Sequence, residues 1–447
     1  MIAARLAWLR RHPIHRILLF IFYIIGRLVA LARWLLRLLT SGRLCKRRTI
    51  AQILAEAEAV AGSSDYGEDG EREAHEAAFK ILLKTFEQWL PFGPLNSFSP
   101  KLAVKLRLVA YLRRHPSLAA APVCRPVFII SLPRSGSTLL HNLLALDSNA
   151  RAMRAWELRK PLPPPTVASF ATDERIKALQ AELNAAYRLH PLIETIHHVT
   201  ADSPDECVQG YYPDYGFPTY SWGAEAFDAA YKWYTADSMR GQFVDYKRLL
   251  QVLCSEVGVD ATHTVLKAPH HLFHLQTIAE TFPGASFVWL HRSYVDVVHS
   301  CCLMNLHVHE YTSVAFEPPE VIGRRTLERL ANAVHAAQTA RETLEAAGTR
   351  FVDVSYDELK ADPAACCEAL YAKLGLPWRA EVGEAIVRHL ESEESAGRSR
   401  RLPPNQRLTL EEFGLDRWTL LRPFYGLGED RWWGHTPAWN GGVKPWG

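Results

Sequence analysis

The stretch FIISLPRSGSTLLHNLL, residues 128–144, runs from an apolar segment through a polar turn into a segment with regularly spaced leucines. The apolar run predicts a buried strand, and the leucine spacing predicts a helix. In α/β sheets, ligands bind at the carboxyl ends of strands, where the chain turns into helices. Such a helix start carries about half a positive charge and unpaired N–H groups. The turn is therefore predicted to bind a multiply charged oxyanion.

Five consecutive residues of this turn can donate to an anion. Arg134 supplies a forked cation, Gly136 allows close approach of the backbone, and Ser135, Ser137 and Thr138 add N–H and hydroxyl groups. A Walker A loop would have an earlier glycine at a fixed spacing and a lysine, and this turn lacks both. An ordinary kinase or NTPase is therefore disfavoured, while a purely structural strand-to-helix connection stays open.

A second group of polar residues occurs in VLKAPHHLFHLQTIAETFPGASFVWLHRSYVDVVHS, residues 265–300. Lys267 ends one predicted strand and Arg292 ends the next. Ser300 follows eight residues later, two turns into a predicted helix. An arginine and a hydroxyl that converge in this way predict a second phosphate site.

Four short segments, 126–132, 263–268, 285–291 and 350–356, are nearly continuous in apolar residues. This is typical of strands buried on both faces, and predicted helices separate them. The chain is therefore predicted to be an α/β protein with a P-loop-like parallel sheet flanked by helices. A large, mostly helical insertion between the first two strands either shapes a substrate pocket or adds packing.

Composition limits the functional classes. The 447 residues are 48% hydrophobic, enough for a sizeable core, and the net charge of +3 gives no indication of nucleic-acid binding. The eight cysteines show no zinc-site spacing, so no metal site is predicted. The oligomeric state stays open.

Residues 1–48 differ in character from the rest of the chain. Their uninterrupted apolar core, 17–26, is shorter than the roughly 20 residues that span a bilayer. On a helix, Arg5, Arg16 and Arg27 share one stripe opposite Leu, Ile, Phe and Trp side chains. This pattern predicts an amphipathic helix in the membrane interface, with a spanning helix or a helix buried in an oligomer as alternatives. The basic cluster RLCKRR favours a cytoplasmic location with peripheral or monotopic membrane association.

Four regions are expected along the chain. The arm 1–48 precedes a helical region, 49–121, and the main α/β domain, 122–425. A Trp-rich tail, 426–447, follows.

Several motifs resemble those of one enzyme family. LPRSGSTLL resembles the 5′-phosphosulfate loop of sulfotransferases, and HRSYVDVVHS resembles their 3′-phosphate motif. DSPDEC, YKRLLQVL, VLKAPHHLFHLQTIAETFPGASFVWLHR, YDELKADPAACCEALYAKLGLP and LTLEEFGLD resemble, in order, the bacterial-type sulfotransferases related to the tyrosylprotein enzymes. The likeness covers roughly residues 122–425.

The resemblance implies 3′-phosphoadenosine-5′-phosphosulfate as donor and no metal. It assigns residues 134–138 to the phosphosulfate end, and Arg292 and Ser300 to the 3′-phosphate. Arg407 stands where relatives place basic residues near the nucleotide. The sequence departs from the family where Ser293-Tyr294 replaces a common Asp-Pro pair.

Sulfuryl transfer needs cations on the transferring group and a base for the acceptor hydroxyl. Arg134 and Lys267 can supply the cations. The resemblance favours Glu157, in AMRAWELRKP, as the base, with His270 as the second candidate. The alternative for Glu157 is a surface carboxylate. For Glu206, in DSPDEC, we expect a structural or substrate-facing role.

Tyr356-Asp357 is expected to end a strand and cap the next helix.

Together, the motifs and the resemblance predict a membrane-associated sulfotransferase that acts on a hydroxylated small-molecule or lipid acceptor. The competing hypotheses are an ATP-dependent P-loop phosphotransferase and a non-catalytic nucleotide-binding protein at the membrane.

Overall fold

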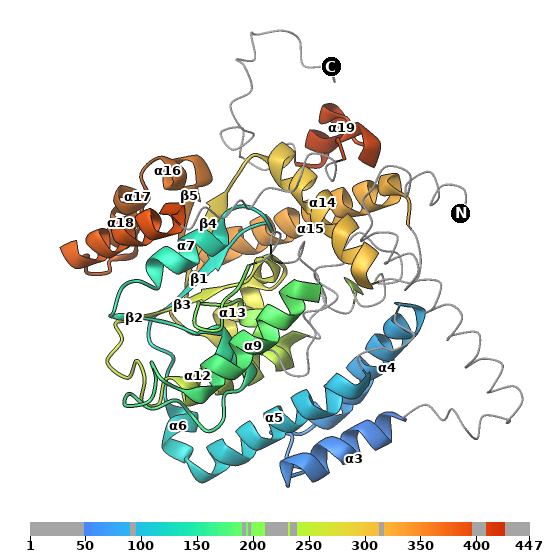
Figure 1. The fold of residues 1–447 in the computed structure, drawn as a ribbon, viewed down its shortest axis with the longest axis vertical. Helices are drawn as coiled ribbons and strands as arrows, with labels where there is room; N and C mark the ends of the chain where they lie inside the picture. Colours follow the sequence, from blue (N-terminus) through green and yellow to red (C-terminus); the bar gives the residue numbers. More distant parts are fainter. Residues whose placement is uncertain are drawn as a thin grey trace, which may run out of the picture.

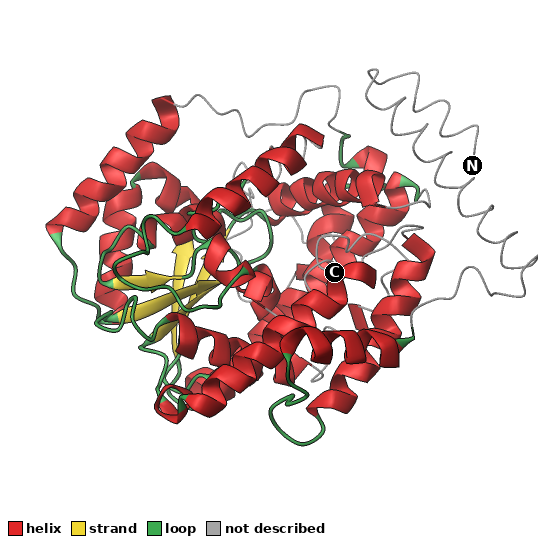
Figure 2. Ribbon diagram, turned by 60° about the horizontal axis from the view of Figure 1, so that its bottom comes forward, coloured by secondary structure: helices red, strands yellow, loops and turns green. Residues whose placement is uncertain are grey.

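A five-stranded parallel sheet forms the centre of the computed structural model, with helices on both faces (Figures 1 and 2). The structure describes residues 49–89, 95–189, 194, 198–210, 231–232, 239–312, 317–395 and 408–424. The expected α/β fold is confirmed. The predictions for the arm 1–48, for Arg407 and for the tail 426–447 lie outside the described residues.

The strand order is β2-β3-β1-β4-β5, with β1 in the middle. Four of the strands were predicted, and one, β2, was missed because its three residues, Ala-Arg-Ala, contain no apolar run. The strands are β1 Pro126–Ile130, β2 Ala150–Ala152, β3 His263–Lys267, β4 Ser286–His291 and β5 Arg350–Ser355.

The described helices include those predicted for region 49–121 and for the insertion. The α-helices are α3 Ile50–Ala61, α4 Glu71–Trp89, α5 Leu95–Arg114, α6 Pro116–Ala120, α7 Ser137–Leu144, α8 Ala155–Arg159, α9 Glu174–Leu189, α12 Arg240–Leu253, α13 Leu275–Thr281, α14 Tyr294–Thr312, α15 Pro319–Ala346, α16 Tyr356–Ala361, α17 Pro363–Leu374, α18 Ala380–Ser395 and α19 Arg417–Leu421. Short 3-10 helices are η1 Cys207–Gly210, η5 Pro269–Phe273, η7 Glu411–Phe413 and η8 Arg422–Phe424.

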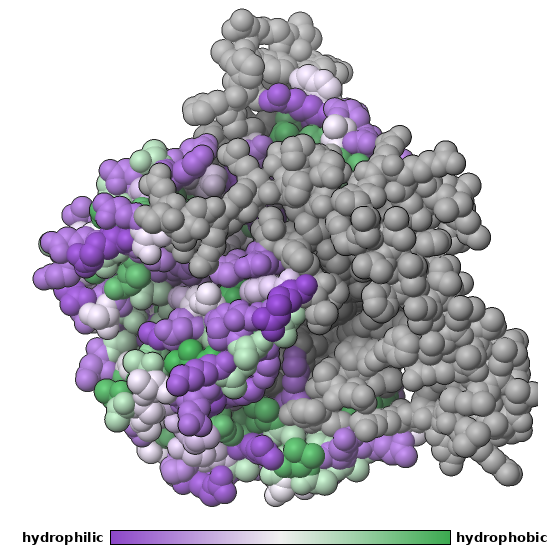
Figure 3. Space-filling view, in the orientation of Figure 1, coloured by the Kyte–Doolittle hydropathy of each residue, from purple (hydrophilic) through white to green (hydrophobic). Residues whose placement is uncertain are grey.

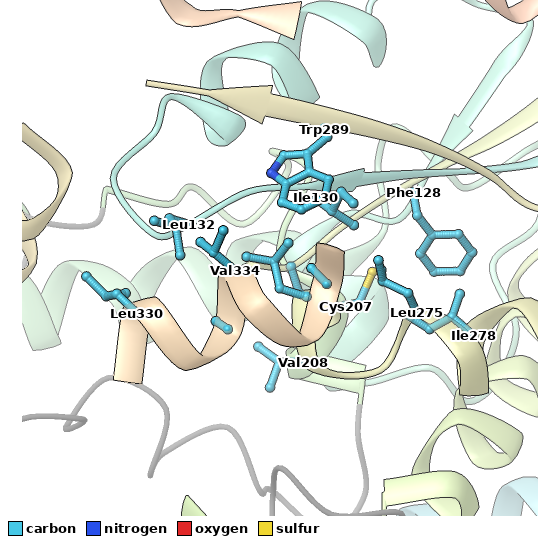
Figure 4. Packing of buried hydrophobic residues seen from close by; sticks show 14 of the residues in the cluster. Phe128, Ile130, Leu132, Cys207, Val208, Leu275, Ile278, Trp289, Leu330 and Val334 are labelled. Carbon is cyan, nitrogen blue, oxygen red and sulfur yellow. The ribbon is translucent and has the colours of Figure 1, made fainter. Parts of the chain in front are cut away.

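Each face of the sheet has its own hydrophobic core. Successive residues of a strand point to opposite faces, so Phe128 and Ile130 join one core while Val127 and Ile129 join the other. Figure 4 shows the first core, in which Trp289 of the sheet packs above α15. Helices α7, α17 and α18 cover the second core. Burial on both faces explains why β1 is apolar throughout.

The strand register brings four chain turns to one edge of the sheet. β1 pairs with β3 on one side and with β4 on the other, with Ile129 opposite Lys267 and Ile130 opposite Trp289. On the next pair of strands, His291 lies opposite Ser355. The turns that follow β1, β3, β4 and β5 therefore lie next to one another at the carboxyl ends of the strands.

A buried ionic cluster joins the amino-terminal helices to the main domain. Lys105 of α5 is 2% exposed, and its Nζ lies 2.7 Å from Glu71 Oε2 of α4 and 2.8 Å from Asp245 Oδ2 of α12. Arg248 of α12 binds the same two carboxylates at 3.0 and 2.9 Å. Because two cations face two carboxylates, the cluster holds α4, α5 and α12 together without an unpaired charge.

The described surface is mixed in polarity. Figure 3 shows hydrophilic side chains interspersed with smaller hydrophobic areas over the described part of this face. The large hydrophobic side chains that are exposed are scattered: Val60, Val167, Val259, Val387 and Trp418. In the part of the chain that the structure describes, no helix combines the length and apolar character needed to cross a membrane.

Candidate active site

The turn between β1 and α7 has an unusual backbone. Arg134 has φ +66° and Gly136 has φ +93°, both in the left-handed region. A non-glycine residue there costs about 1–2 kcal/mol, and such strain is concentrated at functional sites. Gly136 is the N-cap of α7, and no side chain caps this helix. The first N–H groups of α7 are thus available to an anion.

Hydrogen bonds join this turn to the one that follows β4. Arg292 Nη1 donates to the carbonyl oxygen of Arg134 at 2.9 Å, and Arg134 Nε donates to Ser300 Oγ at 3.1 Å. The structure therefore brings together the two anion-binding segments that the sequence predicts. Each segment holds the other in position.

The ring of Tyr356 packs against both Arg292 and Gly136, a role that was not predicted. The guanidinium carbon of Arg292 lies 4.6 Å from the centre of the Tyr356 ring. A Cβ atom added to Gly136 would come within 2.5 Å of Tyr356 Cδ2. The predicted cap was wrong in detail, because the Ser355 hydroxyl accepts from Asp357 N and caps α16. The sequence could not show this contact because it depends on β5 lying beside β4.

Lys267 extends from β3 toward the start of α7. Its Nζ donates to Glu206 Oε1 at 2.8 Å and lies 3.4 Å from Thr138 Oγ1. Both charged side chains are almost completely buried. Lys267 therefore lies beside the turn between β1 and α7, as expected from its position at the end of a strand. Its pairing with Glu206, 61 residues away in the chain, was not predicted.

Two buried histidines lie near Lys267. Burial lowers the pKa of His141 to about 3 and that of His270 to about 4, so both rings are neutral at pH 7. His270, the second candidate for the base, is 2% exposed and follows Lys267 on η5. A neutral ring can accept a proton, but one with so low a pKa does so weakly.

Glu157 is completely buried, so the alternative of a surface carboxylate is wrong. Both of its oxygens are bonded to Arg151 of β2, with Oε2 3.0 Å from Arg151 Nη1. Oε2 also accepts from the backbone N–H of Arg154 at 2.9 Å and so caps α8. A carboxylate held in this way must break an ion pair to take a proton, and its role as the base stays a hypothesis.

Two of the predicted nucleotide-binding residues keep a buried polar atom that could bind a ligand. Ser135 Oγ and Arg292 Nε are buried and have no hydrogen-bond partner among the described residues. One belongs to the turn before α7, and the other to the arginine that follows β4. Within the same described ranges, no cluster of three or more His, Cys, Asp or Glu side chains could hold a metal ion.

Comparison with known proteins places the chain in a family. The model of the sulfotransferase family matches residues 126–380, which is more than half of the chain. The chain belongs to the sulfotransferase family. This region contains β1 to β5 together with the turns described above.

Two curated relatives are similar in sequence. Both are named omega-hydroxy-beta-dihydromenaquinone-9 sulfotransferase Stf3, one from Mycobacterium bovis and one from Mycobacterium tuberculosis. Each is 26% identical over 259 residues, which cover 56% of this chain. The match spans 63% of the length of these relatives.

Two solved structures share the fold. Sulfotransferase STF1 from Mycobacterium tuberculosis has a TM-score of 0.70 and 23% identity, and covers 85% of this chain and 99% of its own. Sulfotransferase STF9 from Mycobacterium avium has a TM-score of 0.72 and 24% identity, and covers 85% of this chain and 96% of its own. At this level of identity, the likeness establishes the fold.

The first prediction concerns the close approach at Gly136. Gly136→Ala places a methyl group against Tyr356 and forces alanine into the left-handed region, so the turn must distort. We expect affinity for adenosine 3′,5′-bisphosphate, measured by calorimetry, to fall at least about tenfold, which corresponds to roughly 1.4 kcal/mol. Gly241→Ala is the control, because a Cβ there meets no atom within 4 Å. Unchanged affinity in Gly136→Ala would contradict this account of the turn.

The second prediction separates two roles of Glu157. Glu157→Gln leaves the Arg151 cation buried without its partner, so we expect unfolding free energy to fall by about 3–5 kcal/mol in a denaturant titration. In the double variant Arg151→Met with Glu157→Leu, no buried charge is left, and stability should largely recover. If Glu157 is structural, turnover recovers with stability. A stable double variant that still lacks turnover would identify Glu157 as the base.

Proposed function

We propose that this protein transfers a sulfuryl group from 3′-phosphoadenosine-5′-phosphosulfate to a hydroxyl group of a lipid-like or other small acceptor. The observation that carries this proposal is the connection between two anion-binding segments. Arg292 donates to the Arg134 carbonyl, and Arg134 donates to Ser300. A donor nucleotide with an anion at each end matches such a pair of segments. Membership of the sulfotransferase family supports the same reaction.

Residues 134–138 would hold the phosphosulfate end, because the N–H groups at the start of α7 and the Arg134 guanidinium favour negative charge. Arg292 and Ser300 would hold the 3′-phosphate, with Arg292 kept in place by Tyr356. Arg407 remains a candidate for the nucleotide on sequence grounds alone. When bound, the donor supplies an activated sulfuryl group with a phosphate as its leaving group.

Lys267 is proposed to stabilise the negative charge that grows on the leaving phosphate. Its position 3.4 Å from Thr138 Oγ1 supports this role, because Thr138 belongs to the proposed phosphosulfate turn. Arg134 would contribute a second cation. Glu157 and His270 remain the two hypotheses for the base that takes the acceptor proton.

The acceptor is proposed to be amphiphilic. The Stf3 relatives are named for a hydroxylated dihydromenaquinone, which is a lipid-like molecule. An amphipathic arm over residues 1–48 would bring the site close to such a molecule at a membrane. We therefore propose a cytoplasmic enzyme with peripheral or monotopic membrane association.

The third prediction tests this function directly. The full chain is incubated with sulfur-labelled donor and with lipid and aqueous fractions of cell extract. We expect label in a lipid-soluble product.

Arg292→Lys should raise the donor KM about tenfold or more, because lysine has no planar fork for phosphate or for stacking on Tyr356. Arg388→Lys is the control, because this side chain is 67% exposed on α18.

Two results would contradict the proposal. Tight binding of adenosine 3′,5′-bisphosphate without label in any fraction would indicate a non-catalytic nucleotide-binding protein. Transfer of phosphate from labelled ATP, with no sulfuryl transfer, would indicate a phosphotransferase.

A further inference from the structure

Glu206 has a position that neither the sequence motifs nor the proposed reaction explains. It precedes η1 and accepts a hydrogen bond from Lys267 Nζ at 2.8 Å. The exposed fractions of the two side chains are 2% for Lys267 and 5% for Glu206. A charge pair this deeply buried is screened very little by solvent, so its two charges attract each other strongly.

The other titratable groups around Lys267 cannot replace Glu206 as its counter-ion. They come from three elements: His141 from α7, Cys207 from η1, and His270 and His271 from η5. Burial lowers the pKa of each histidine and raises the pKa of Cys207 to about 12. All four are neutral at pH 7. Among these described neighbours of Lys267, Glu206 alone carries a negative charge.

A buried lysine without a counter-ion tends to lose its proton, and its pKa can fall by about 3 to 5. Lys267 would then be neutral in the physiological range. A neutral amine next to Thr138 would offer an anion a weak hydrogen bond instead of a charge.

We propose that Glu206 is a positioning residue of the anion site, which keeps Lys267 protonated and directed toward Thr138 at the start of α7. This inference rests on the proposed function, because it concerns the cation that would meet the 5′ end of the donor. Glu206 acts through Lys267 and is not assigned contact with the acceptor.

The test compares pH profiles of binding. Glu206→Gln keeps the size of the side chain and an oxygen that can accept from Lys267, but removes the charge. Affinity of the full chain for adenosine 3′,5′-bisphosphate is measured by calorimetry between pH 5 and pH 9.5. The folded state of each variant is checked by circular dichroism at the same pH values.

The direction of the effect follows from the sign of the charge. A lysine with a lowered pKa is cationic below that pKa and neutral above it, so binding weakens as pH rises. We expect the affinity of Glu206→Gln, relative to that of the wild type at the same pH, to fall at least about tenfold from the lowest to the highest pH. For the conservative variant Glu206→Asp, which keeps the carboxylate, this ratio to the wild type should change less than about threefold.

A double variant assigns the titration to Lys267. Lys267→Met with Glu206→Gln leaves neither charge in the pocket, so it should fold and bind weakly with a profile parallel to that of the wild type. A double variant whose affinity relative to the wild type still falls steeply as pH rises would overturn the inference.

The outcomes also separate this inference from the proposed function. If the wild type binds the bisphosphate and folded Glu206→Gln follows the wild-type pH profile, Glu206 does not control Lys267 and the inference alone is wrong. If the wild type binds no bisphosphate at any pH, the proposed function is wrong and the inference is overturned with it.

Discussion

The hydrogen bond from Arg292 Nη1 to the Arg134 carbonyl oxygen is the contact on which the site depends. It joins the turn after β1 to the turn after β4, so the position of each arginine constrains that of the other. The left-handed backbone of Arg134 presents its carbonyl to Arg292 while its side chain reaches Ser300. The central sheet makes this possible, because β1 and β4 are adjacent and parallel and their carboxyl ends lie together.

Buried ion pairs elsewhere in the described part of the chain hold other elements of the domain together. Arg151 of β2 clamps Glu157 of α8, and the cluster around Lys105 attaches the amino-terminal helices to α12. Lys267 and Glu206 join β3 to the segment before η1. Breaking a buried pair leaves an uncompensated charge, which makes each pair a strong constraint on how its elements are placed. Of these pairs, Lys267 and Glu206 alone contact the turn between β1 and α7.

The sequence predicts those features whose signal is local. Strands buried on both faces are apolar throughout, and glycine and hydroxyl residues at a strand-to-helix turn indicate an anion site. The sequence of β2, Ala-Arg-Ala, has no apolar run. This segment becomes a strand because it pairs with β3, which the sequence alone does not show. The contacts of Tyr356 and of Glu206 join residues far apart in the chain and require the strand order to be known. The sheet and the closeness of the turns after β1 and β4 were therefore predictable, whereas the residues that support these turns were not.

The central claim is that one nucleotide is held at both ends by two connected turns. Its most direct test is a crystal structure of the full chain with adenosine 3′,5′-bisphosphate. The account predicts one phosphate within hydrogen-bond distance of the N–H groups of Gly136, Ser137 and Thr138, and the other against Arg292 and Ser300. A bisphosphate bound elsewhere, or with only one phosphate in contact with these turns, would contradict it.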